Sequence, residues 1–159
     1  MNHDRYDDAY LRDILRSVKT IAMVGASTNW NRPSYFVFKY LQGKGFRMIP
    51  VNPGSAGESL LGETVYAALE DIPVAVDMVD IFRKSEAAGA ITDAAIAIGA
   101  KVVWMQLGVR DDEAAARAEA AGLKVVMNRC PKIEWGRLHG ELGWGGINSG
   151  IISSRRRKE

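Results

Sequence analysis

The sequence predicts an α/β fold: one doubly wound domain around a mostly parallel, five-stranded sheet with helices on both faces. Three observations predict it. Short apolar runs of strand length alternate along the chain with longer segments of helical hydrophobic spacing. The chain has 159 residues and 47% hydrophobic content, which suits one core. Gly25 ends the first apolar run where the chain must turn toward a helix, so the expected domain is Rossmann-like.

The first expected elements are a helix, a strand and a second helix. Residues 7–18 show helical spacing of apolar side chains and carry acids early, as an amphipathic helix does. The run over 20–25 has the continuous apolar character of a strand that is buried on both faces. Pro33 suits the first position of a helix over 33–44.

The same alternation continues to the fifth strand. An alanine-rich segment predicts one helix, and another helix begins with three acids and ends at Gly122. The remaining expected elements are a strand over 46–51, a loop over 54–62, a short helix over 64–69, a strand over 75–81, a helix over 85–98, a strand over 101–105, a helix over 111–121 and a strand over 123–127.

Residues that follow the expected strands are the candidate binding residues, because doubly wound domains bind ligands at the carboxyl ends of their strands. These residues are Gly25, Ala26, Ser27, Thr28, Arg32, Pro33 and Ser34, then Asn52 and Pro53, then Asp80, Ile81, Phe82 and Arg83, and finally Gln106, Leu107, Gly108 and Val109. A helix start and arginine side chains both suit phosphate. The pattern predicts a phosphate-rich ligand with an apolar or amide-bearing part.

The usual dinucleotide fingerprint is incomplete in this chain. Its first glycine is present at Gly25, but Ser27 and Trp30 stand in place of the second and third. The second strand ends at Asn52, where NAD-binding domains carry an acid for the ribose. The sequence therefore indicates a nucleotide phosphate at the first turn and argues against NAD.

Five motifs follow one another at the strand ends. They are Val24-Gly25-Ala26-Ser27 with Arg32-Pro33-Ser34-Tyr35, Val51-Asn52-Pro53, Val79-Asp80-Ile81-Phe82-Arg83, Trp104-Met105-Gln106-Leu107-Gly108, and Asn128-Arg129-Cys130-Pro131-Lys132-Ile133-Glu134. With these motifs the chain resembles the stand-alone bacterial CoA-binding protein family. The fold of that family is similar to the CoA-binding N-terminal domain of succinyl-CoA synthetase α subunits. The end of the chain, 148–154, is also similar.

The resemblance implies a bound coenzyme A. It implies that residues 25–27 and 32–34 surround the pyrophosphate and that residues 52–53 lie by the adenosine. It also implies contacts along the ligand from 80–83 and from 106–109.

The chain departs from the usual family pattern at two positions. Asn128 stands where family members often have Asp, and Trp135 stands where they often have His. If these positions carry chemistry in the family, we do not expect that chemistry in this chain. Both positions lie far from the phosphate turn, so we expect a smaller effect on binding.

Other polar and aromatic residues fit structural roles. Asp80 fits an N-cap of the helix over 85–98, or a loop hydrogen bond, better than a catalytic acid. The tryptophans Trp104, Trp135 and Trp144 fit packing, and His139 fits a packed or surface position. Two histidines and one cysteine are too few for a His/Cys metal site, and we expect no catalytic residue.

The basic charge of the chain lies at its end. Residues 155–159 carry four bases and one acid, whereas the rest has 17 bases and 18 acids. We expect one domain over 1–154 and a solvated basic tail over 155–159, with no nucleic-acid partner, because no recognition motif accompanies the tail. A polar N-terminus, no long apolar run and a single cysteine predict a cytoplasmic protein without a membrane partner.

Cys130 leaves two interpretations open. It stands between Arg129 and Lys132, and positive neighbours lower the pKa of a thiol. It is therefore a candidate redox thiol that could pair with the thiol of CoA. The other interpretation is a small buried residue.

The residues favour a ligand-binding module over an enzyme. We expect the chain to bind coenzyme A or a short acyl-CoA and to serve as a non-catalytic sensor, carrier or regulatory module. A doubly wound fold also permits an NAD-binding or other dinucleotide-binding redox protein or regulator. A third interpretation is a nucleotide-modulated interaction subunit, whose tail or Gly-rich stretch 136–150 docks an unknown protein partner.

Overall fold

The computed structural model describes residues 1–140, and its central sheet has the five strands that the sequence predicts. They are β1 (Thr20–Val24), β2 (Arg47–Val51), β5 (Met78–Ile81), β6 (Val102–Met105) and β7 (Lys124–Val126). All five pair in parallel, in the order β2-β1-β5-β6-β7. The chain runs outward from β1 to β2 and then returns to β5 on the other side of β1. This reversal is the topological switch point at which such sheets bind ligands.

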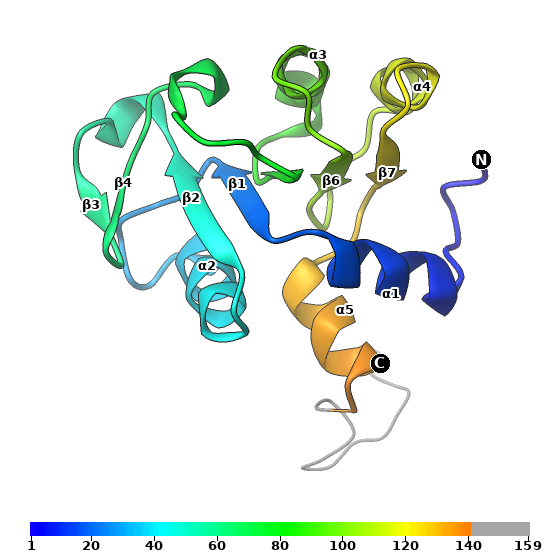
Figure 1. Cartoon of the computed structure of the whole chain (residues 1–159), viewed down its shortest axis with the longest axis horizontal. Helices are drawn as coiled ribbons and strands as arrows, with labels where there is room; N and C mark the ends of the chain where they lie inside the picture. Colours follow the sequence, from blue (N-terminus) through cyan, green and yellow to red (C-terminus); the bar gives the residue numbers. More distant parts are fainter. Residues whose placement is uncertain (141–159) are drawn as a thin grey trace.

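The helices form one layer on each face of the sheet (Figure 1). Helices α1 (Asp8–Ser17), α2 (Pro33–Gly43) and α5 (Pro131–Leu138) cover one face, and α3 (Ser85–Ala97) and α4 (Asp112–Ala120) cover the other. No helix in residues 1–140 is both long and apolar enough to cross a bilayer. Helix α5 is absent from the expected elements, although proline at its first position is a recognisable start signal.

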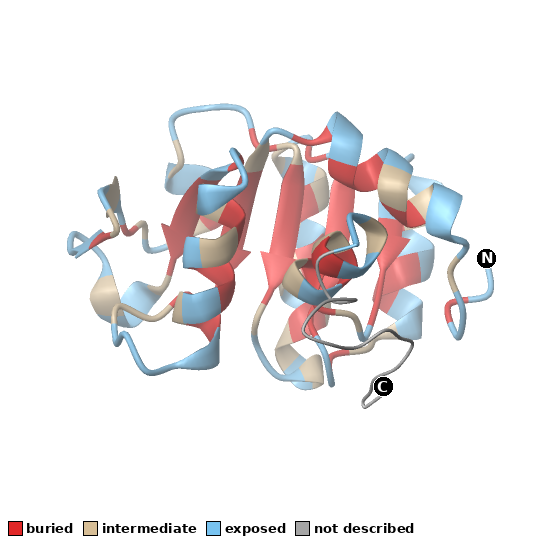
Figure 2. Cartoon of the chain, turned by 90° about the horizontal axis from the view of Figure 1, so that it is seen from below, coloured by how far each residue is buried: buried red, intermediate tan, exposed pale blue. Residues whose placement is uncertain are grey.

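Each face of the sheet has its own hydrophobic cluster, and Figure 2 shows the buried residues along the strands between the helices. On the face of α1 and α2 the cluster contains large side chains, among them Phe38, Leu41 and Trp104. On the other face the helices contribute small side chains, such as Ala88 and Ala115. Small side chains let α3 and α4 pack close to the sheet and to each other.

The short helix predicted over 64–69 is wrong. Thr64 instead ends an antiparallel hairpin of strands β3 (Ser59–Leu60) and β4 (Glu63–Thr64), and Tyr66 then bridges to Val51 of β2. The two residues between them, Leu61 and Gly62, have φ angles of 47° and 88°. Two consecutive residues of positive φ make the tight turn whose twist matches a hairpin. The strand pairing of Thr64 and Tyr66 then excludes a helix at the start of the predicted segment.

The chain after the hairpin runs beside β2. The Tyr66 N–H donates to the Pro50 carbonyl at 3.0 Å, and the Tyr66 carbonyl accepts from the Asn52 N–H at 2.9 Å. The outer edge of β2 is thereby paired. Two short 3₁₀ helices flank this region, η1 (Pro53–Ser55) and η2 (Leu69–Asp71).

The other edge strand, β7, is capped by tyrosine hydroxyls. The Tyr10 hydroxyl donates to the Val125 carbonyl at 2.9 Å and accepts from the Val125 N–H at 3.1 Å. The Tyr6 hydroxyl accepts from the Met127 N–H at 2.8 Å. Burial raises the pKa of Tyr10 to about 12, so this hydroxyl keeps its proton. Backbone N–H and carbonyl groups at the open edge of β7 thus find hydrogen-bond partners on α1 and on the residues before it.

We predict that Tyr10→Phe lowers the free energy of unfolding by about 1–2 kcal/mol, because both backbone groups of Val125 lose their partner. Chemical denaturation measures the change. Tyr66→Phe is the matched control, since the Tyr66 hydroxyl makes no hydrogen bond among residues 1–140, and it should change stability little. Equal losses in the two variants would show that the cap contributes nothing.

Candidate ligand-binding site

A cavity of about 870 Å³ opens at the carboxyl ends of β1, β2, β5 and β6. Most of the predicted binding residues line it: Gly25, Ser27, Arg32, Pro33, Ser34, Asn52, Phe82, Arg83, Gln106, Leu107, Gly108 and Val109. The lining also includes four residues that the sequence reasoning missed, namely Asn29, Lys84, Glu86 and Ala87. The last three lie at the start of α3. The sequence reasoning missed them because it considers only residues directly after each expected strand.

Five predicted residues do not line this cavity in the described part of the chain: Ala26, Thr28, Pro53, Asp80 and Ile81. Ala26 is buried in the core. The Thr28 hydroxyl donates to a Glu58 carboxylate oxygen at 3.5 Å, a long contact. Ile81 is buried among the residues that face α3 and α4.

Hydrogen bonds within the protein shape the loop after β1. The Ser27 N–H donates to the Ser34 hydroxyl at 3.1 Å, which folds the loop back onto the start of α2. The Asn52 side chain donates to the Ala26 carbonyl at 2.8 Å and accepts from the Gly54 N–H at 2.9 Å. Asn52 is therefore a brace between two loops, and its side-chain amide is already engaged on both sides.

The close approach of the chain that follows β5 to the first turn explains why Gly25 is a glycine. A Cβ atom at this position would lie 2.3 Å from the Phe82 carbonyl oxygen and 2.8 Å from the Cδ atom of Arg83. The φ angle of Gly25 is also positive, at 96°. Glycine is thus required by the chain itself, because the end of β5 occupies the space that a side chain would need.

Three basic side chains face the cavity without carboxylate partners. Arg32, Arg83 and Lys84 are exposed and form no ion pair within residues 1–140. Some other basic residues are paired instead, as Arg117 is with Asp93 at 2.9 Å. Arg32 and Lys84 are also the N-cap residues of α2 and α3, so the positive ends of two helix dipoles meet the same cavity. Unpaired cations and helix N-termini together form a setting for phosphate.

The loop between β6 and α4 closes the far end of the cavity. Gly108 has a φ angle of 82°, and its N–H donates to the Asn128 side-chain oxygen at 2.7 Å. The Ser85 hydroxyl donates to the Gly108 carbonyl at 3.4 Å and accepts from the Arg110 N–H at 3.0 Å. Leu107 lies between these anchors and is 53% exposed. The anchored loop presents an apolar side chain to the cavity mouth.

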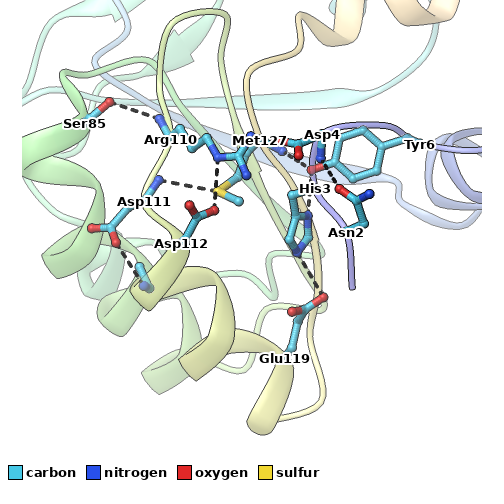
Figure 3. A network of polar contacts seen from close by, with 11 residues as sticks. Asn2, His3, Asp4, Tyr6, Ser85, Arg110, Asp111, Asp112, Glu119 and Met127 are labelled. Carbon is cyan, nitrogen blue, oxygen red and sulfur yellow. Dashed lines mark hydrogen bonds and ion pairs between the residues drawn. The ribbon is translucent and has the colours of Figure 1, made fainter.

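Contacts from the N-terminal segment hold the residues behind this loop (Figure 3). Arg110 pairs with Asp4 at 2.7 Å and with Asp112 at 3.0 Å. His3 lies 2.7 Å from the Tyr6 hydroxyl and 3.3 Å from a Glu119 carboxylate oxygen. The first residues of the chain thus support the loop from outside the cavity.

A second, apolar hollow of about 350 Å³ adjoins the cavity and shares Arg83 and Ala87 with it. Its walls come from the ends of β1 and β2, the segment around η2 and the small side chains of α3. They are Val24, Val51, Pro53, Ala67, Ala68, Leu69, Glu70, Arg83, Ala87, Ala90, Ile91 and Ala94. Arg83 therefore stands at the boundary between a polar space and an apolar one.

Asp80 is not the N-cap of α3, and it does not line the cavity in the described residues. It lies within β5, is fully buried, and neither of its carboxylate oxygens has a hydrogen-bond partner in the described residues. The N-cap residue of α3 is Lys84 instead. Burial raises the pKa of Asp80 to about 8, so the carboxyl is largely protonated at neutral pH. The expected cap or loop hydrogen bond is thus wrong, because the strand continues past this residue into the core.

The lowered pKa expected for Cys130 is also wrong. The residue is 5% exposed, and burial raises the pKa of its thiol. Its basic neighbours point elsewhere: Arg129 donates to the Asp4 carbonyl at 3.2 Å, and the Lys132 ammonium lies 5.4 Å from the centre of the Tyr40 ring. Cys130 belongs to the core cluster, as the buried interpretation predicts.

Trp104 and Trp135 pack within the described part of the chain. Trp104 is fully buried and donates its indole N–H to the Arg129 carbonyl at 2.9 Å. Trp135 packs on Phe46, and His139 is exposed. Residues 1–140 contain no group of three or more His, Cys, Asp or Glu that could hold a metal ion. Trp144, the motif at 148–154, the basic tail and most of the Gly-rich stretch lie outside the described residues.

Comparison with known proteins places the chain in a family. A family model described as "CoA binding domain" matches residues 19–136. The chain therefore belongs to this family, which confirms the resemblance seen in the sequence. An uncharacterized protein of Bacillus subtilis (strain 168), YneT, is 34% identical over 125 residues, which span 79% of this chain and 91% of that protein.

Solved structures share the fold. A hypothetical protein from Pyrococcus horikoshii OT3 matches with a TM-score of 0.82 and 40% identity, over 88% of this chain and 97% of that one. A protein from Thermus thermophilus matches with a TM-score of 0.79 and 38% identity, over 84% and 99%. An acetyl-coenzyme A synthetase of Ca. Korarchaeum cryptofilum shares the fold alone, at 24% identity and a TM-score of 0.59, over 69% of this chain and 26% of that one.

We predict that Gly25→Ala lowers the free energy of unfolding by about 3 kcal/mol, because its Cβ meets the Phe82 carbonyl and its φ is unfavourable. Gly43→Ala is the matched control, since a Cβ there meets nothing within 4 Å and the residue is helical. It should raise stability by about 0.5 kcal/mol. Urea denaturation measures both variants. An unchanged stability of Gly25→Ala would contradict the close contact between position 25 and the Phe82 carbonyl.

We predict a pH dependence of stability that belongs to Asp80. The folded state keeps the proton up to about pH 8, whereas the ordinary pKa is 3.8. The folded state therefore binds more protons between these values, and the free energy of unfolding falls as the pH rises from about 4 to about 8. Asp80→Asn should flatten this slope in urea denaturation at pH 5 to 8. The same slope in both proteins would rule out a buried, protonated Asp80.

Proposed function

We propose that the chain binds coenzyme A in the cavity at the carboxyl ends of its strands. The observation that carries this proposal is the convergence of Arg32, Arg83 and Lys84, all without carboxylate partners among residues 1–140, with the N-termini of α2 and α3. Unpaired cations repel one another, and a ligand with several phosphate charges relieves that repulsion. Membership of the CoA-binding family supports the same ligand.

The two adjoining hollows suit the two chemical halves of this ligand. The pyrophosphate lies at the loop after β1, beside Arg32 and the start of α2. The adenosine enters the apolar hollow between Pro53 and α3, with Arg83 at the boundary. The pantetheine arm runs past Gln106 and Leu107, toward the exposed end of the cavity. A short acyl group at the end of this arm would reach solvent, so the site is open to acyl-CoA as well.

The role that fits this site is a non-catalytic sensor, carrier or regulator of CoA status in the cytoplasm. The groups that face the cavity are basic, amide, hydroxyl or apolar, with Glu86 as the single carboxylate in the described lining. The two buried titratable groups nearby, Asp80 and Cys130, both have raised pKa values and lie outside the lining. Such a set binds and orients a phosphorylated ligand and offers no paired acid and base.

We predict that Arg32→Ala weakens the binding of CoA about 10–100-fold, the loss expected for a charge-assisted contact to phosphate. The binding of pantetheine, which has no phosphate, should stay within a factor of two. Isothermal titration calorimetry of the full chain measures both ligands.

The matched control is Lys39→Ala, because Lys39 is exposed on the same helix α2 and lies outside the lining. It should leave both affinities unchanged. Equal losses for CoA and pantetheine in Arg32→Ala would remove Arg32 from the phosphate site. Binding of NAD with higher affinity than CoA would overturn the proposed ligand.

A further inference from the structure

A second basic pocket lies at the opposite end of the strands. It has a volume of about 240 Å³ and is formed by the end of α1, the turn before β2 and the last turn of α5. Its polar lining consists of Arg12, Arg16, Lys19, Lys44 and His139, and no carboxylate among residues 1–140 lines it. Lys19 precedes β1 directly, so the pocket is separated from the proposed CoA site by the length of the sheet.

Three of the basic side chains in this pocket have no carboxylate partner in the described residues. Arg12, Arg16 and Lys19 form no ion pair with any residue in 1–140. Other basic residues at the same end of the sheet are paired: Arg47 with Glu63 at 3.6 Å, and Lys124 with Asp13 at 2.6 Å.

The two arginines also repel each other. Arg12 and Arg16 are one turn apart on α1, where like charges destabilise a helix. The negative end of the helix dipole favours Arg16 in the last turn, but Arg12 is half-buried in the middle of the helix and gains little from it. An anion in the pocket would offset both costs.

The base of the pocket is aromatic and has an unused donor. The ring of Trp135 is stacked on His139, with ring centres 3.9 Å apart and planes at 18°, and its edge meets Phe46. The Trp135 indole N–H is buried and has no acceptor in the part of the chain that the structure describes. A buried donor without a partner is costly, so this wall of the pocket holds a polar group that the described chain leaves unsatisfied.

We propose that this pocket is a second ligand site, which takes a small phosphate monoester carried on a flat ring. The arginines supply planar donors for the phosphate, and the stacked aromatic pair supplies a flat wall for the ring. The volume admits a single ring with its phosphate and excludes a dinucleotide. This site is independent of the proposed CoA site and does not rest on it.

Phenyl phosphate is the probe that carries both features. In a ¹⁵N NMR titration of the full chain, it should shift the Trp135 indole N–H resonance in a saturable way. The variant Trp135→Phe assigns this resonance. The double variant Arg12→Gln/Arg16→Gln should raise the dissociation constant at least tenfold. Arg47→Gln is the matched control, because it removes one arginine charge at the same end of the sheet, outside the pocket, and should change the constant less than twofold.

Three results would overturn the proposal. One is the absence of a saturable shift of the Trp135 indole resonance up to the highest soluble concentration of phenyl phosphate. Another is an equal loss of affinity in the double variant and in Arg47→Gln, which would indicate general surface charge. The third is equal affinity for inorganic phosphate and phenyl phosphate, which would indicate an adventitious ion only. The comparison requires that the double variant keeps the wild-type unfolding midpoint. Trp135→Phe is a second test of the same pocket, because it changes the aromatic wall without changing the charge.

Discussion

The close contact between the end of β1 and the residues that follow β5 is the constraint on which the rest of the site depends. The Phe82 N–H donates to the Val24 carbonyl at 2.8 Å, and the Gly25 N–H donates to the Val51 carbonyl at 2.9 Å. The ends of β1, β2 and β5 are thereby fixed to one another within a single turn. This arrangement leaves no room for a side chain at Gly25. It also sets where α2 begins and where Arg83 leaves the sheet.

The two ends of the sheet share one electrostatic feature: basic side chains that the described chain leaves unpaired. At the carboxyl ends these are Arg32, Arg83 and Lys84, and at the amino ends they include Arg12 and Arg16. In the interior the chain does the opposite, because Asp80 avoids an unpaired buried charge by holding its proton. At both ends of the sheet, unpaired basic charge thus faces hollows that solvent and ligands can reach.

Much of the fold and the site could be predicted from the sequence, because apolar runs and helix starts are local signals. The five strands, four of the five helices and most of the cavity lining follow from them. The hairpin at Leu61 could not be predicted this way, since a leucine with positive φ carries no local signal. Nor could the full burial of Asp80, because a carboxylate inside a strand is ordinarily expected at a polar position, and only the packing of helices on both faces of the sheet buries it. The family itself was predicted from five motifs and is confirmed by the match over residues 19–136.

The central claim is that CoA lies across the switch point between β1 and β5. A ¹⁵N NMR titration of the full chain with CoA tests it most directly, because backbone amides report where the ligand lies. The account predicts the largest shifts at Ser27, Lys84 and Gly108, which line three separate walls of the cavity. No shift at saturating CoA, or shifts confined to the opposite end of the sheet around Lys19, would contradict it.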